Sequence, residues 1–254
     1  MQRVEAASVA LAPRIPFWWF AAPIALAMAL IALDQMSDAD RTITRLFVDA
    51  DTRAFPLRYS FVLEIVMHQW AKYVVITIGA LVGAAVVLTY VVPPWQPRRR
   101  ILVFLLLSMA LAPLSVTAGK AVSSPHCPWD IDEFGGLVPY AHLLEPRVTR
   151  VVPGHCFPAG HASTGFALMA FYFAAYVLGR REWAWYALVF SVGAGLLLGF
   201  GRVLQGAHFV SHVLWSGVFC WTVMLLLYVM AFVSPGRSHR KNACTPRSAP
   251  QDIS

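Results

Sequence analysis

The sequence predicts an all-α fold, an integral membrane bundle of about six transmembrane helices. Three observations support this prediction. Hydrophobic residues make up 58% of the 254 residues and charged residues only 13%, whereas a soluble domain usually carries about 25% charged residues. Six apolar stretches have the length of a membrane span, and basic residues flank several of them. Most of this chain is therefore expected to face lipid or the interior of a bundle.

The six apolar stretches define the expected helices. A membrane-spanning helix needs roughly 20 mainly apolar residues, and in lipid every backbone group must find its partner within the helix. We therefore expect one helix per stretch and a single membrane domain over residues 1–254. The stretches lie near 17–34, 71–92, 101–119, 162–179, 183–201 and 213–233.

The first stretch resembles a secretory signal peptide, because a basic segment precedes it. It is longer than the usual apolar region of such a signal, and no clear small-residue cleavage site follows before Asp34. We therefore expect a retained membrane anchor. Cleavage would leave the orientation of the remaining helices unchanged.

The segment 35–70 mixes charged and apolar residues. Part of it can form one face of a short interfacial helix, and a loop packed over the bundle is the alternative. The face would consist of Leu57, Phe61, Val62, Ile65 and Val66.

The charge pattern predicts the orientation of the helices. With the N-terminus inside and six alternating spans, the inside segments are 1–16, 93–100, 180–182 and 234–254. They contain 11 of the 20 basic residues and only three acidic ones, Glu5, Glu182 and Asp252. This bias follows the rule that basic residues stay on the cytoplasmic side. The basic residues are Arg3, Arg14, Arg98, Arg99, Arg100, Arg180, Arg181, Arg237, Arg240, Lys241 and Arg247.

Two further segments have a clear polar character. Residues 120–161 are rich in proline, glycine, histidine and acidic side chains and form the main outside loop. Residues 234–254 form a basic polar tail, which we expect to be disordered. The formal net charge of +7 does not indicate a nucleic-acid partner, because the arginines flank apolar stretches rather than line a polar face.

Polar side chains converge where several predicted helices reach the outside. Lys120 ends the third stretch, His161 precedes the fourth, Arg202 follows the fifth, and His208 and His212 precede the sixth. Ionisable groups at such positions are functional candidates. Lysine and arginine hold phosphate oxygens, and two histidines can serve as nucleophile and general acid. The set suits phosphoryl transfer in an outside active-site loop.

Three motifs in this region resemble the type 2 phosphatidic acid phosphatase family. Its first motif is Lys, six residues, then Arg-Pro, and here Lys120 is followed by Cys127-Pro128. Its second is Pro-Ser-Gly-His, which here reads Pro158-Ala159-Gly160-His161. Its third is Ser-Arg, five residues, His, three residues, Asp, which here reads Gly201-Arg202, His208 and His212. The resemblance covers about residues 101–233, the expected catalytic core.

The resemblance implies a metal-independent phosphoric ester hydrolase, a lipid phosphatase without a cofactor. His208 would attack phosphorus to form a phosphohistidine, and His161 would protonate the leaving oxygen. Lys120, Arg202 and the backbone of Gly160 would hold the phosphoryl oxygens. The substrate would be a phosphomonoester or pyrophosphate of a membrane lipid, such as lipid A or a polyprenyl pyrophosphate.

The sequence departs from the family pattern at four positions. Cys127 replaces an arginine, and His126, Arg147 or Arg150 are candidates for the missing positive charge. Ala159 and Gly201 replace serines. His212 replaces the aspartate that would orient the nucleophile, and the loop acids Asp130, Asp132 or Glu133 are candidates for a compensating negative charge.

Three other functions remain open at this stage. A phosphotransferase would use the same intermediate with a lipid acceptor in place of water. A zinc site is the enzymatic rival, since several histidines and cysteines cluster here, but Lys120 and Arg202 would repel a dication. A non-catalytic lipid-binding or transport protein is the third, although such proteins usually place polar groups midway along helices.

The cysteines predict a disulfide. Cys127 and Cys156 lie in the same outside loop, whereas Cys220 falls in the sixth stretch and Cys244 in the tail. Because disulfides persist in oxidising compartments, we expect a bond between Cys127 and Cys156. The short basic turns and compact length favour a bacterial inner membrane, with both termini cytoplasmic and a periplasmic active site.

Overall fold

The computed structural model describes residues 15–145 and 152–233, and the described part contains helices, turns and loops but no strand. The predicted substitutes Arg147 and Arg150, the N-terminal segment and the C-terminal tail lie outside the described residues.

Five helices in the described part are long and apolar enough to cross a membrane. They are α1 (Trp18–Met36), the pair η1 (Val62–Trp70) and α3 (Ala71–Val91), the pair η2 (Pro93–Arg98) and α4 (Arg99–Val122), α7 (Arg181–Leu204), and α8 (Val210–Tyr228) with η6 (Val229–Val233). The predicted all-α membrane bundle is therefore confirmed.

The fourth apolar stretch forms a helix with an irregular centre. It comprises α5 (Gly160–Phe166), the 3-10 turn η5 (Ala167–Met169) and α6 (Ala170–Val177). A close backbone approach accompanies this irregularity: a side chain on Gly165 would meet the backbone of Gly195 in α7 at 2.4 Å. Only glycine permits this contact, which brings the end of α5 against α7.

The second membrane helix begins earlier than the sequence predicted. It starts at Val62 as a π-helical segment and continues into α3, whereas the apolar pattern suggested a start near residue 71. The proposed interfacial helix is therefore wrong, since Val62, Ile65 and Val66 belong to the spanning helix. Its first turns carry Glu64 and His68, whose polarity concealed the helix from a hydropathy argument.

Aromatic contacts hold together the end of the bundle at which α1 begins. Trp19 of α1 is fully buried and donates its indole N–H to the hydroxyl of Tyr172, at 2.6 Å. Trp221 of α8 donates to the backbone oxygen of Trp19, at 2.9 Å. Buried Tyr and Trp groups need such partners, so these bonds fix α1 on α6 and α8.

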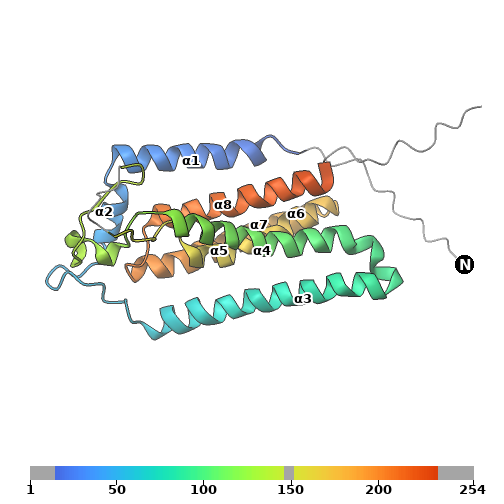
Figure 1. The fold of residues 1–254 in the computed structure, drawn as a ribbon, viewed down its shortest axis with the longest axis horizontal. Helices are drawn as coiled ribbons and strands as arrows, with labels where there is room; N and C mark the ends of the chain where they lie inside the picture. Colours follow the sequence, from blue (N-terminus) through green and yellow to red (C-terminus); the bar gives the residue numbers. More distant parts are fainter. Residues whose placement is uncertain (1–14, 146–151, 234–254) are drawn as a thin grey trace, which may run out of the picture.

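The chain direction of the helices brings one set of ends together. α1 packs on α8, α3 on α4, and α5 against α7 and α8. Figure 1 shows the end of α4, the starts of α5 and α8 and the short helix α2 (Ala39–Arg45) at the same end of the bundle. A small core of Phe55, Ile131, Phe134 and Phe209 anchors the loops at this loop end.

Candidate functional site

Four of the predicted site residues lie at this loop end. Lys120 is in the last turn of α4, His161 in the first turn of α5 and Arg202 in the last turn of α7. His208 lies in the connection between α7 and α8. Lys120, Arg202 and His161 are all close enough to His208 to affect its charge state.

Arg202 is the most strongly bonded member of the cluster. Its Nη1 donates to Glu64 Oε2 at 2.8 Å and to Gln205 Oε1 at 2.7 Å. Its Nε is buried and has no hydrogen-bond partner in the described part of the chain. A buried guanidinium donor without a partner costs about 1–3 kcal/mol, and an oxygen acceptor brought to this N–H would offset that cost.

His161 faces a residue that the sequence analysis did not single out. Its ring centroid lies 3.4 Å from that of His68, in an edge-to-face arrangement. His68 Nδ1 lies 3.1 Å from Glu64 Oε1 and 3.3 Å from Arg202 Nη1. Glu64 and His68 therefore connect Arg202 with His161.

Glu64 and His68 had a detectable signal in the sequence. They are four residues apart, so a helix places them on one face, and ionisable side chains inside a spanning helix are functional candidates. Hydropathy does not reveal this pair, because it starts the second span near residue 71 and leaves the segment 35–70 outside the membrane.

Lys120 carries the second positive charge of the cluster. Within residues 15–145 and 152–233, no carboxylate lies at ion-pair distance from its ammonium group. The backbone oxygen of Lys120 lies 3.2 Å from Nδ1 of His155, on the segment that leads to His161. Lys120 thus offers a charge that is not neutralised by a protein carboxylate.

His208 is held by a tight connection between two helices. Gly206 has a positive φ of 74°, and its backbone oxygen accepts a hydrogen bond from the Trp129 N–H at 3.0 Å. His208 is only 4% exposed. Burial, with the positive charges of Lys120 and Arg202 nearby, keeps the pKa of His208 well below its ordinary value.

The structure joins Cys127 and Cys156 in a disulfide, the pair that the sequence predicts, with Cα atoms 5.2 Å apart. The sulfur of Cys156 lies 3.5 Å from Nδ1 of His208. Cys156 also bonds through its backbone N–H to Pro125, at 3.0 Å. The bridge therefore links the segment after Lys120 to the segment before His161 and contacts the side chain of His208.

His212 does not orient His208 in this structure. The two ring centroids are 6.0 Å apart, and one ring nitrogen of His212, Nδ1, is buried without a hydrogen-bond partner in the described residues. The expected equivalence of His212 with the family's aspartate has no support in this geometry.

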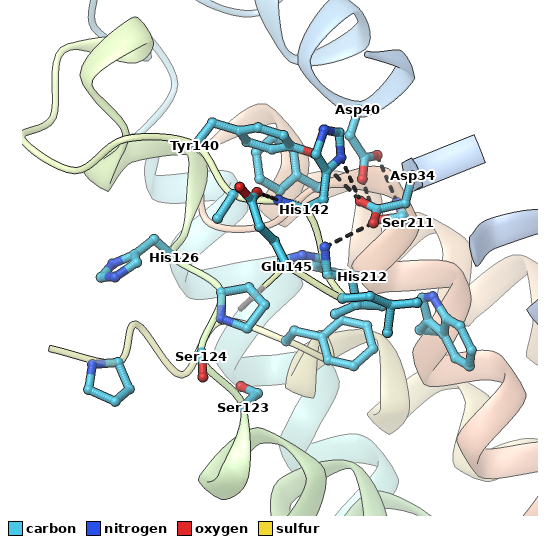
Figure 2. Close-up of a pocket in the computed structure, with 18 of the residues that line it drawn as sticks. Asp34, Asp40, Ser123, Ser124, His126, Tyr140, His142, Glu145, Ser211 and His212 are labelled. Carbon is cyan, nitrogen blue, oxygen red and sulfur yellow. Dashed lines mark hydrogen bonds and ion pairs between the residues drawn. The ribbon is translucent and has the colours of Figure 1, made fainter. Parts of the chain in front are cut away.

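The other predicted residues are distributed differently. His126 and His212 line a cavity of about 690 Å³ beside the cluster, shown in Figure 2. Gly160 opens α5, and a side chain there would meet no atom within 4 Å. Among the described residues, Glu133 forms ion pairs with Arg41 and Arg45 and not with the cluster. The carboxylate that contacts Arg202 is that of Glu64.

A metal centre does not fit the donor atoms. Ligand atoms of Cys156, His208 and His212 lie within 4.8 Å of one another. A cysteine binds zinc as a thiolate, whereas the sulfur of Cys156 is bonded to Cys127. Two histidines without the thiolate are an incomplete set for a structural zinc site.

Comparison with known protein families gives one match. The profile of the PAP2 superfamily matches residues 101–234, which include most of α4, the loop between α4 and α5, and the helices α5, α6, α7 and α8. Searches of curated proteins and of solved structures found no match. The matched region is more than half of the chain and contains Lys120, His161, Arg202 and His208, and the chain belongs to the PAP2 superfamily.

Proposed function

We propose that this protein is a membrane lipid phosphatase that removes a phosphomonoester or pyrophosphate group from a lipid through a phosphohistidine. Members of its superfamily are generally phosphatases. One observation carries the proposal: two cationic side chains lie next to two histidines. Arg202 Nε has no hydrogen-bond partner among the described residues, and no described carboxylate neutralises Lys120. Such preorganised cations stabilise a transferring phosphoryl group.

The contact with Cys156 supports His208 as the nucleophile. A disulfide sulfur carries no hydrogen, so the contact at 3.5 Å requires His208 Nδ1–H to be the donor. In the neutral ring, Nε2 then keeps its lone pair. Burial and the nearby cations favour this neutral form, which is the nucleophilic form.

His161, whose ring lies against that of His68, is the proposed acid. Burial lowers the pKa of His161 to about 3 in the free protein, so the proposal requires the bound phosphate anion to stabilise its protonated form. A hydrogen bond from His68 Nδ1–H to Glu64 leaves the other ring nitrogen of His68 as an acceptor, and the ring centroid of His68 lies 3.4 Å from that of His161. We assign to Glu64 the positioning of Arg202 and His68, and to His68 the positioning of the His161 ring. These two residues supply a carboxylate–imidazole pair beside Arg202 and His161.

The proposed reaction has two steps. His208 Nε2 attacks phosphorus, the bond from phosphorus to the lipid oxygen breaks, and His161 gives its proton to that oxygen. Water then attacks the phosphohistidine, the P–N bond breaks, and the proton that water loses returns to His161. Inorganic phosphate leaves, and both histidines regain their starting states.

Arg58 is a candidate for the charge lost at Cys127. Its guanidinium lies 4.6 Å from the ring centroid of Trp129, and the guanidinium of Arg202 lies 5.9 Å from the same ring. Gln205 links the two by donating to the backbone oxygen of Arg58 and accepting from Arg202. We therefore include Arg58 in the proposed phosphate site.

The positions of the arginine-rich turns support a proposed orientation in the membrane. Arg98, Arg99 and Arg100, and Arg180 and Arg181, lie at the end of the bundle opposite the cluster. Basic residues favour the cytoplasmic side, so we propose a bacterial inner membrane, cytoplasmic termini and a periplasmic site.

Phosphate release by the purified protein tests the function. The substrates are a panel of phosphatidic acid, phosphatidylglycerophosphate, polyprenyl pyrophosphate and lipid A, each assayed with and without a chelator. We expect release from at least one lipid, unchanged by the chelator and absent in His208→Ala. Release that requires added zinc, or that persists in His208→Ala, would contradict the proposal.

A further inference from the structure

The cavity of about 690 Å³ is separate from the catalytic cluster. Segments of α1, α4, α8 and the outside loop surround it, and its lining includes neither Lys120, His161, Arg202 nor His208. His212 lies at its wall and its ring is 6.0 Å from that of His208. The cavity is of the size that holds a small molecule or part of a lipid.

Its walls divide into an apolar part and a polar part. Val122, Trp215 and Phe219 are contributed by spanning helices, together with the neighbouring Phe157. In Figure 2, Ser123 and His126 lie on one side of the cavity, and Asp34, Asp40, Tyr140 and His142 gather on the other. An apolar wall beside a polar opening matches an amphipathic ligand.

The acidic residues that line the cavity form hydrogen bonds with the loop segment 142–145 and with the start of α8. Asp34 accepts the Leu143 N–H at 2.9 Å, and Asp40 accepts the backbone N–H of Ser211 at 3.1 Å and its hydroxyl. Glu145 accepts the His142 N–H at 3.0 Å. Because these three carboxylates surround the opening, an anionic head group would be repelled there, in contrast to the catalytic cluster.

His212 provides the specific contact. It is 5% exposed, and its Nδ1 has no hydrogen-bond partner among the described residues. A neutral imidazole has one acceptor nitrogen, and we assign that role to the unpartnered Nδ1. The ring centroids of Phe157 and Phe209 each lie 5.3 Å from the ring centroid of His212 and carry no polar group. A ligand that donates a hydrogen bond to Nδ1 would therefore satisfy an otherwise unpaired buried atom.

We propose that this cavity binds an uncharged lipid whose head group carries hydroxyl groups. A head-group hydroxyl donates to His212 Nδ1, and the first part of the acyl chain lies against Val122, Trp215 and Phe219. The free acceptor is a neutral imidazole and the carboxylates are already bonded, which favours a hydroxyl over an ammonium group. The site does not depend on phosphoryl transfer.

Photolabelling tests this site with the full chain in phosphatidylcholine nanodiscs, since the choline head group has no hydrogen-bond donor. The probe is a monoacylglycerol with a diazirine in its acyl chain, and labelled peptides are located by mass spectrometry. We expect label on the peptides that carry Val122 and Trp215. Unlabelled monooleoylglycerol should displace the probe at about a five- to tenfold lower concentration than methyl oleate, the effect of one hydrogen bond.

Three variants keep the test specific. Val122→Trp and Leu144→Trp narrow the cavity and should each reduce labelling at least threefold, because both residues line it. Val91→Trp is the matched control, since Val91 is exposed at the far end of α3 and does not line the cavity. His212→Phe should retain labelling but lose the preference for monooleoylglycerol over methyl oleate.

Specific results would overturn the proposal. They are equal displacement by monooleoylglycerol and methyl oleate in the wild-type protein, stronger displacement by oleylamine, and labelling unchanged in both narrowing variants.

Discussion

Arg202 is held and left available at the same time. Its Nη1 is bonded to Glu64 and Gln205, which fixes the guanidinium plane, while its Nε has no partner in the described part of the chain. A fixed guanidinium loses less freedom when it binds phosphate. The ion pair with Glu64 therefore serves the position of Arg202 more than the stability of the protein.

Removal of Glu64 tests this positioning role. Glu64→Ala should lower kcat at least about tenfold, because a charge-assisted hydrogen bond contributes roughly 1.5–3 kcal/mol. Glu64→Gln keeps an acceptor oxygen for Arg202 and should retain most of the rate. Gln69→Ala, an exposed position on the same helix, is the control, and kinetics of phosphate release is the measurement. Equal rates for Glu64→Ala and Gln69→Ala would contradict the role.

The buried His208 predicts a pH dependence of stability. Its pKa is lowered by burial and by its neighbours His212, Lys120, Arg202 and His161, so the folded protein resists protonation that the unfolded chain accepts below about pH 6.5. Stability from this group is present above that pH and is lost as pH falls. The melting temperature of wild type in detergent should thus drop more steeply between pH 7 and pH 5 than that of His208→Asn. A steeper drop in His208→Asn would refute this.

At the scale of elements, the sequence predicted which segments are helical better than it predicted the residues at which the helices begin and end. Hydropathy found the five candidate spans of the described residues, and the motifs placed Lys120, His161, Arg202 and His208 at one end. It did not find the start of the second helix, because Glu64 and His68 lower the hydropathy of a segment that the bundle nevertheless packs against α7. Nor does sequence spacing reveal that the ring centroid of His212 lies 6.0 Å from that of His208.

The disulfide belongs to the element scale, because it joins two segments that flank the site. Its 29-residue separation corresponds to about 3–4 kcal/mol in the chain-entropy model. Cys127→Ser should therefore lower the melting temperature and also reduce kcat, since Cys156 contacts His208. Alkylation of non-reduced wild-type protein followed by mass spectrometry should leave both cysteines unmodified. Full alkylation of both after oxidising expression would contradict the bond.

At the scale of the whole molecule, the helices run so that the arginine turns and the catalytic cluster lie at opposite ends. Single cysteines in a chain without Cys244 test the membrane orientation. Leu137→Cys, at a residue 96% exposed in the loop between α4 and α5, should react with an impermeant maleimide added to intact spheroplasts. Gln96→Cys, in the turn before α4, should react only after lysis. The reverse pattern would place the cluster in the cytoplasm.

The central claim is that His208 forms a covalent bond to phosphorus. The direct measurement is rapid quenching of the purified protein with its best lipid substrate, followed by peptide mass spectrometry under conditions that preserve phosphohistidine. We expect a phosphoryl group on His208 in wild type, and none on any peptide in His208→Ala. A phosphoryl group on another residue, or turnover in His208→Ala, would contradict the mechanism.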